Sequence, residues 1–379
     1  MKKGWTYKKL GECFISINNG ANIKQVKGAK GFPITRIETL SNDVFNRDRM
    51  GYADIEELTP YSSYVLNDGD ILMSHINSMK FLGRAVEYTK KGEEKVIHGM
   101  NLLRLIPSDG VLSSFMVYQF QTSFFRNQIA LISHQSVNQA SFNTTNLKGL
   151  DLILPSLSEQ KRIVKRLDAA FAQIDELNAN AEKQLAEARA LFQKSLAKAM
   201  EPKEGWEEMK LGEFAYMKAG DFVKASDIHK DYSEGLYPCY GGNGLRGYVK
   251  EPNQDGDFCL IGRQGALCGC INRASGVFRT TEHAVIVKPY KEIPTSLVFY
   301  LLTNLNLNKY ATGAAQPGLS VNNIAEVVRI SVPPAKDYQH IVERLDSISE
   351  NVRKYEEIKQ KIIAECDALK QALLRQVFE

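Results

Sequence analysis

The sequence has only six cysteines and two tryptophans among 379 residues, and it has no apolar run long enough to span a bilayer. A secreted protein of this size would more often carry a denser cysteine framework, so the scattered cysteines favour a reducing compartment. The opening MKKGWTYKK contains lysines without a following apolar segment and does not resemble a signal peptide. We therefore expect a cytoplasmic protein with no membrane partner.

Recognisable catalytic motifs are also missing. There is no Asn-Pro-Pro-aromatic or Asp-Pro-Pro-aromatic methyltransferase box, no phosphate-binding loop ending in Gly-Lys-Ser/Thr, no H-E-x-x-H and no G-x-S-x-G. Cys268 and Cys270 have C-x-C spacing, whereas zinc sites prefer C-x-x-C. We expect no catalytic residue and no bound metal.

Excess positive charge is small, because the net charge is only +4. A protein that holds nucleic acid by phosphate neutralisation alone needs a more strongly basic surface. If this chain binds DNA, local contacts or partner proteins must supply much of the attraction.

The chain does contain a long internal repeat. GWTYKKLGE at 4–12 and GWEEMKLGE at 205–213 agree at six of nine positions and include both tryptophans. A second match follows in the same order, because LPSLSEQKRIVKRLD at 154–168 aligns with VPPAKDYQHIVERLD at 332–346, without gaps from Pro155 and Pro333 onward. The repeat is too long for a solenoid unit, so we infer a tandem duplication of one module.

Each copy ends in a segment that predicts a long helix. Apolar residues recur every three or four positions in 156–203 and 335–379, and Ser156 with Glu159 has capping-box spacing. Such steps predict an antiparallel coiled coil of helices roughly 60 to 65 Å long. The alternative is that each stripe covers only its own domain. The predicted seam consists of Ile163, Leu167, Ile174, Leu177 and Leu185 in the first helix, and of Ile341, Leu345, Ile348, Val352, Tyr355, Ile362, Leu369 and Leu373 in the second.

The segments before the helices, 1–155 and 204–334, predict two mixed globular domains. Each has short apolar runs that end at proline, such as LLRLIP at 102–107 and AVIVKP at 284–289. Each also has one short helical segment, at 113–129 and 295–310. We expect an α+β fold with two α/β domains of short strands, an internal pseudo-two-fold repeat, and tryptophans that serve as hydrophobic anchors.

This combination resembles the specificity subunit of a type I restriction-modification system. The resemblance rests on the repeated W…KLGE opening, the strands GDILMS and GDFCLI, and the proline-led entries to both long helices. It covers essentially the whole chain. In the second copy Tyr338 replaces Gln160, which puts any role of that glutamine in doubt.

The resemblance implies that 1–155 and 204–334 are target recognition domains, each reading half of an asymmetric bipartite sequence in double-stranded DNA. The helices 156–203 and 335–379 would set the spacing and dock methyltransferase subunits, expected to be two. The chain would be non-catalytic and would bind no cofactor. S-adenosylmethionine, ATP and magnesium would belong to methyltransferase and restriction subunits.

Candidate base-reading residues are polar side chains that loops can carry to the major groove. In the first domain these are Ser74, His75, Asn77, Lys80, His134, Gln135 and Asn138; in the second they are Asn243, Arg246, Arg263, Gln264, Arg279, Thr281 and His283. For each of them a solvated surface role is an equal alternative. His98 and His283 fall at similar points of the repeats, and a strand-end histidine with a satisfied hydrogen bond is the simpler interpretation of both.

Three other functions are compatible with the sequence. They are an orphan bipartite DNA-binding or architectural protein, a coiled-coil scaffold that binds proteins, and a nuclease with an unrecognised carboxylate site. Specific DNA binding by the isolated chain would favour the orphan DNA-binding protein. Absence of DNA binding even with a methyltransferase would favour the scaffold, and magnesium-dependent cleavage by the pure chain would favour the nuclease.

Overall fold

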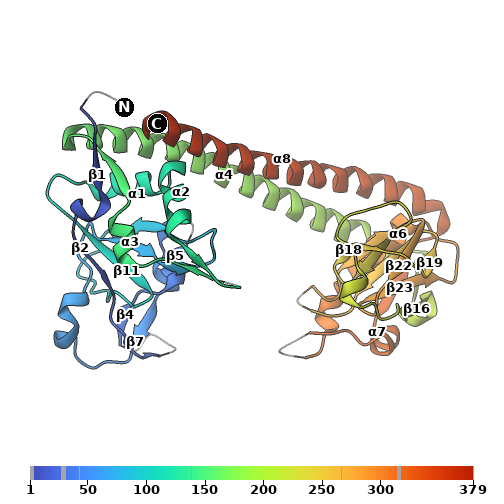
Figure 1. The fold of residues 1–379 in the computed structure, drawn as a ribbon. Helices are drawn as coiled ribbons and strands as arrows, with labels where there is room; N and C mark the ends of the chain where they lie inside the picture. Colours follow the sequence, from blue (N-terminus) through green and yellow to red (C-terminus); the bar gives the residue numbers. More distant parts are fainter. Residues whose placement is uncertain are drawn as a thin grey trace. The chain divides into compact units, whose positions relative to one another are not determined.

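The computed structural model describes residues 4–26, 31–41, 43–137, 139–265, 267–313 and 317–378. The chain divides into two compact units, one made of residues 1–180 with 360–379 and the other of 181–359. Each unit contains one globular domain and a portion of both long helices (Figure 1). None of the helices in the described ranges combines the length and apolar character that crossing a membrane requires.

The first unit is centred on a four-stranded antiparallel sheet in the order β10-β8-β11-β2. Its core continues into the short helices and the start of the first long helix. The strands are β1 (Thr6–Lys9), β2 (Phe14–Asn19), β3 (Gln25–Val26), β4 (Phe32–Ile34), β5 (Leu40–Ser41), β6 (Val44–Phe45), β7 (Gly51–Ala53), β8 (Ile71–Ser74), β9 (Ile76–Asn77), β10 (Ala85–Glu87), β11 (Leu102–Pro107), β12 (His134–Gln135), β13 (Ala140–Ser141) and β14 (Asp151–Leu154). The short helices are α1 (Ser113–Phe120), α2 (Ser123–Ile132) and α3 (Thr144–Lys148).

The second unit has an equivalent sheet in the order β16-β23-β20-β21 and adds a second four-stranded sheet, β18-β17-β22-β19. Its strands are β15 (Glu207–Lys210), β16 (Ala215–Ala219), β17 (Tyr237–Gly241), β18 (Gly244–Val249), β19 (Gln254–Asp255), β20 (Phe258–Gly262), β21 (Ile271–Ala274), β22 (Val277–Thr280), β23 (Ala284–Pro289) and β24 (Arg329–Val332). Its short helices are α5 (Leu211–Phe214), α6 (Thr295–Asn304) and α7 (Val321–Val327).

The duplicated sequence forms duplicated structure. The repeated opening becomes β1 paired with β14 in the first unit and β15 paired with β24 in the second. After each strand the glutamate of KLGE accepts a hydrogen bond from the backbone N–H three residues earlier, at 3.1 Å for Glu12 and 2.9 Å for Glu213. Trp5 is buried in its core and Trp206 packs against the other, which places both tryptophans in the anchoring role expected of them.

Two expected helices are interrupted. The segment 113–129 divides into α1 and α2 because Thr122 caps a new helix, with its hydroxyl accepting from the Phe125 N–H at 3.2 Å. The segment 295–310 ends its α-helix at Asn304, and Asn306 then adopts a left-handed conformation before a 3₁₀ turn. Local capping chemistry, not the apolar pattern, sets these boundaries.

The two long helices are α4 (Leu157–Ala199) and α8 (Tyr338–Phe378). The Ser156 hydroxyl accepts from the Glu159 N–H at 3.4 Å, as its spacing predicted. Gln160 is fully buried, and its side chain hydrogen-bonds to three backbone groups of the adjoining domain and the helix entry. The helix is therefore fixed to its domain by polar as well as apolar contacts.

Within each unit, the portions of α4 and α8 lie side by side and antiparallel. Ion pairs join Asp175 to Lys370 at 2.6 Å in the first unit, and Glu182 to Lys359 at 3.4 Å and Arg189 to Glu356 at 2.5 Å in the second. Numbers rise along α4 as they fall along α8, which gives the direction. The first turns of α4 also share a core with the last turn of α8.

Burial follows the expected seam only in part. Ile163, Leu167, Ile174, Leu185, Ile341 and Leu345 are buried, and Ile348, Val352, Ile362 and Leu373 are half-buried. In contrast, Leu177, Tyr355 and Leu369 are exposed at 57%, 42% and 49%. The structure does not place these three in the seam.

At each of these three positions the next residue is polar and half-buried. Asn178 is half-buried with a buried Oδ1, Glu356 reaches Arg189, and Lys370 reaches Asp175. A contact between two helices covers only a narrow stripe of each helix. When one residue lies in this stripe, the residue before it lies at the edge and stays exposed.

Candidate DNA-reading surfaces

In the first unit, two polar segments far apart in the sequence meet in one small sheet. β12 pairs with β13, and β13 pairs with β9. Gln135 lies opposite Ala140, which lies opposite Asn77 on its other side. The sequence offered no pattern for this sheet, since each strand has two residues and depends on long-range pairing. Asn138 lies outside the described residues.

The candidates in and next to this small sheet differ in exposure. His134 and Gln135 of β12 are exposed, as is Lys80 in the turn after β9. Asn77 is half-buried, with its Oδ1 accepting from the Ser78 N–H at 2.8 Å. These side chains can present donors and acceptors to a base edge or a phosphate. We call Asn77, Lys80, His134 and Gln135 the first polar surface.

Ser74 and His75 have a more internal position. Ser74 is 1% exposed and its hydroxyl donates to the Phe81 carbonyl at 2.7 Å, so it supports the turn after β8. His75 is half-buried, and burial lowers the pKa of its imidazole below the ordinary value. Its Nδ1 is buried without a hydrogen-bond partner among the described residues. His75 therefore lies inside the domain beside the first polar surface and does not form part of its exposed face.

In the second unit, four candidates line one hollow of about 360 Å³. Asn243 comes from the turn between β17 and β18, and Arg246 comes from β18 itself. Gln264 follows β20, and His283 precedes β23. We call these four residues the second polar surface. The His283 Nε2 lies 3.1 Å from the Glu282 carboxylate, a neighbour that the sequence did not single out.

A close backbone approach shapes this hollow. A Cβ atom on Gly262 would lie 2.0 Å from the carbonyl oxygen of Gly242, so the loop after β20 can approach the glycine turn only if residue 262 lacks a side chain. That contact holds Gln264 beside Asn243.

The remaining candidates of the second domain have other positions. Thr281 is fully buried and accepts from the His283 N–H at 3.4 Å, which makes it a support for that histidine. Arg263 is half-buried, its Nε donates to the Leu319 carbonyl at 3.3 Å, and its backbone N–H donates to the His283 carbonyl at 2.9 Å. Arg279 lies in a different hollow.

That other hollow, of about 560 Å³, contains residues that sequence reasoning missed. Lys224, His229, Lys250 and Arg279 line it together with two acidic residues. Its basic side chains are scattered over more than fifty positions of sequence, so no local charge run marked them. Clustered lysine and arginine side chains of this kind suit contacts with DNA phosphates.

Comparisons with known proteins identify the family of the chain. The sequence model of the type I restriction modification DNA specificity domain matches twice, at residues 2–187 and 203–364. A putative type I restriction enzyme MjaX specificity subunit from Methanocaldococcus jannaschii is 30% identical over 384 residues, covering 94% of this chain and 88% of that protein. The Escherichia coli EcoprrI specificity subunit is 42% identical over 153 residues, and this match spans only 39% of this chain and 38% of that relative.

A solved structure also shares the fold. It comes from work on complex assembly and conformational transition of the type I R-M system, with a TM-score of 0.73 at 17% identity, and covers 100% of this chain and 98% of the other.

Proposed function

The chain belongs to the family of type I restriction-modification specificity subunits, with two target recognition domains, and we propose that each domain reads one half of an asymmetric DNA target. The observation that carries this proposal is the contrast between the two units. The same sheet and helix arrangement supports a three-stranded polar sheet in one unit and a glycine-bounded hollow in the other. Unlike surfaces on like frameworks read unlike half-sites, so the target has no palindrome.

The paired helices set the unread gap between the half-sites and dock methyltransferase subunits, two in the expected assembly. Reading heads on one face of a duplex need a separation of about 34 Å per helical turn, and helices of 43 and 41 residues exceed that length. The modest net charge supports the presence of partners that supply further phosphate contacts.

Chemistry in this proposal belongs to the partners. Methyltransferase subunits would use S-adenosylmethionine, and restriction subunits would use ATP and magnesium. This chain would contribute recognition and positioning, without a catalytic residue or a cofactor of its own. The cytoplasm is the expected compartment, since the DNA and such subunits meet there.

Methylome sequencing tests whether each domain reads its own half-site. Cells carrying the chain with its methyltransferase should show a bipartite methyladenine motif that disappears when the gene is deleted. Replacing His134 and Gln135 by alanine should relax only one half-site, and replacing Arg246 and Gln264 only the other, by about 1 to 3 kcal/mol for each lost bidentate contact. Arg329→Ala, which removes an exposed arginine on β24, is the matched control.

Either pair changing both half-sites would contradict separate reading by the two domains. A methylome that is unchanged on deletion, in cells that express the methyltransferase, would contradict the specificity role itself.

A further inference from the structure

A large groove in the first unit has the wrong charge for DNA. It has a volume of about 950 Å³ and lies between the loops around β6 and β10, helix α1, and the adjoining turns of α4 and α8. Carboxylates outnumber cationic side chains on its walls. The carboxylates are those of Asp43, Glu87, Asp168, Asp175 and Asp367, and the cationic residues are Arg47 and Lys370. We call this feature the acidic groove.

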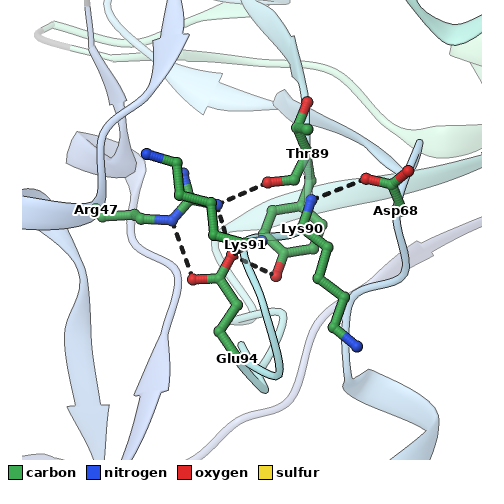
Figure 2. Close-up of polar contacts among 7 residues, drawn as sticks. Arg47, Asp68, Thr89, Lys90, Lys91 and Glu94 are labelled. Carbon is green, nitrogen blue, oxygen red and sulfur yellow. Dashed lines mark hydrogen bonds and ion pairs between the residues drawn. The ribbon is translucent and has the colours of Figure 1, made fainter.

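Both cations of the acidic groove are already paired, Arg47 with an acid outside the groove and Lys370 with Asp175 inside it. Figure 2 shows Arg47 turned toward Glu94, which its Nε and Nη2 contact at 3.0 and 2.5 Å, with a further bond to the Thr89 carbonyl at 2.7 Å. Lys370 is paired with Asp175 at 2.6 Å. Neither is left to neutralise the other acids.

Three of the carboxylates therefore keep their charge uncompensated. Asp43 pairs with Arg84 at 3.0 Å, but Glu87, Asp168 and Asp367 form no ion pair with any residue that the structure describes. Asp168 accepts a hydrogen bond from the Tyr118 hydroxyl at 2.6 Å. Burial, followed by the negative charges of Asp68 and Asp168, raises the pKa of Glu87 above its ordinary value. The groove is a site where an added cation would be stabilised.

The second unit shows the same framework with a cation in place. Tyr300 donates to Asp346, which repeats the contact between Tyr118 and Asp168. Arg273 lies beside this pair, 3.6 Å from Asp346, with its guanidinium 5.4 Å from the Tyr300 ring centroid. It also stacks over a neighbouring phenylalanine at 4.4 Å.

Strand register shows what takes the place of this arginine in the first unit. Arg273 of β21 pairs with Cys259 of β20, and Cys259 pairs with Val287 of β23. Val287 lies two residues before the proline that ends β23. In the first unit the equivalent ladder runs from Leu105, two residues before the proline that ends β11, through Ile71 to Glu87. Glu87 thus occupies the position of Arg273, with the opposite charge.

We propose that the acidic groove binds an arginine side chain of a methyltransferase subunit, and that the second unit lacks this site because Arg273 fills the equivalent position. The occupant is a guanidinium group because that group occupies the matching position, where it meets both a carboxylate and aromatic rings. DNA phosphates would be repelled by the uncompensated acids. No group of three or more possible ligands within the described ranges is arranged to hold a metal ion.

The proposal rests on the specificity role, since it takes the partner to be a methyltransferase subunit. It adds that the two halves of the chain contact their partners differently. The first half would bind a guanidinium group of the partner. The second half would bind none at the equivalent position, because its own Arg273 already lies there.

The test measures the affinity of the full-length chain for its purified methyltransferase subunit at low and high salt. Glu87→Arg would place an arginine where the second unit has one, and should weaken binding at least about tenfold by filling the groove. Glu87→Gln combined with Asp367→Asn removes two of the three uncompensated negative charges and keeps the hydrogen bond between Tyr118 and Asp168. This double variant should also weaken binding and reduce its salt dependence.

Matched controls are Glu93→Arg and Glu93→Gln, because Glu93 is an exposed acid of the same unit outside the groove. Thermal unfolding of each free chain checks that the fold is retained. Residual methylation by the groove variants should keep the wild-type target motif, since no base-reading residue has changed.

Groove variants that are folded and bind as tightly as the wild type would overturn the proposal while leaving the specificity role intact. If the wild-type chain itself binds no methyltransferase subunit, the proposed docking role fails together with the groove.

Discussion

His98 should make the first unit sensitive to mild acid. The ring is 1% exposed, and its Nε2 lies 2.9 Å from the Leu102 carbonyl, the satisfied hydrogen bond expected for a strand-end histidine. Burial lowers the pKa of His98 to about 4, against an ordinary value of 6.5, and the hydrogen bond to Leu102 offsets only part of that shift. Nearby Arg104 and His75 lower it further.

The sign and size of the effect follow from proton linkage. The unfolded chain binds a proton near pH 6.5, but the folded chain does so only near pH 4, so the unfolded state is favoured as the pH falls between these values. Each pKa unit corresponds to about 1.4 kcal/mol, which gives about 3 kcal/mol for His98 across the window. The contribution is complete above pH 6.5.

The assay compares His98→Gln with its parent by urea unfolding between about pH 7.5 and pH 4. A Trp206→Phe background leaves Trp5 as the only tryptophan, so fluorescence reports on the first unit. The variant should lose much less stability on acidification than the parent. Glu94, whose pKa the Arg47 hydrogen bond lowers to about 2, acts mainly below this window. Equal losses in parent and variant would refute the assignment.

Three further substitutions test separate features. Gln160→Ala removes a buried side chain with three hydrogen bonds and should lower the free energy of unfolding by about 1 to 3 kcal/mol, measured by urea titration; an unchanged value would contradict the anchoring role. Arg104→Met leaves Asp70 buried without its 2.6 Å partner and should lower the free energy of unfolding by about 3 to 5 kcal/mol. Adding Asp70→Asn should restore most of this loss, and a double variant that loses the sum of the two single losses would contradict the pairing. Gly262→Ala should displace the Gly242 turn and relax one half-site in the methylome, and a wild-type motif would show that the close approach is dispensable.

The parts of the fold that the sequence predicted are those fixed by local signals. β11 and β23 span the apolar runs that end at Pro107 and Pro289, because proline cannot continue a ladder and marks its limit. The start of the first long helix was likewise visible in the spacing of Ser156 and Glu159. Such features need no knowledge of what the segment packs against.

The remaining features depend on partners that lie far away in the sequence. The pairing of β9, β12 and β13 brings Asn77 beside the 134–141 hairpin, although sixty residues of chain separate them. The inward position of Lys370 depends on Asp175 across the helix pair, so an apolar pattern could not predict it. The equivalence of Glu87 and Arg273 likewise depends on how the strands pair in both units, which local sequence does not reveal.

One ladder position shows how the duplicated frame supports different surfaces. Ser74 lies opposite Leu102 in the first unit, and Gly262 lies opposite Ala284 at the matching place in the second. A serine here hydrogen-bonds within its own turn and lets the chain continue into β9, whereas a glycine lets the chain approach the β17–β18 turn. The four-stranded sheets beneath keep equivalent strand orders, β10-β8-β11-β2 and β21-β20-β23-β16. The residue at the end of β8 or β20 therefore changes the surface that a common sheet order carries, as the proposed reading of two unlike half-sites requires.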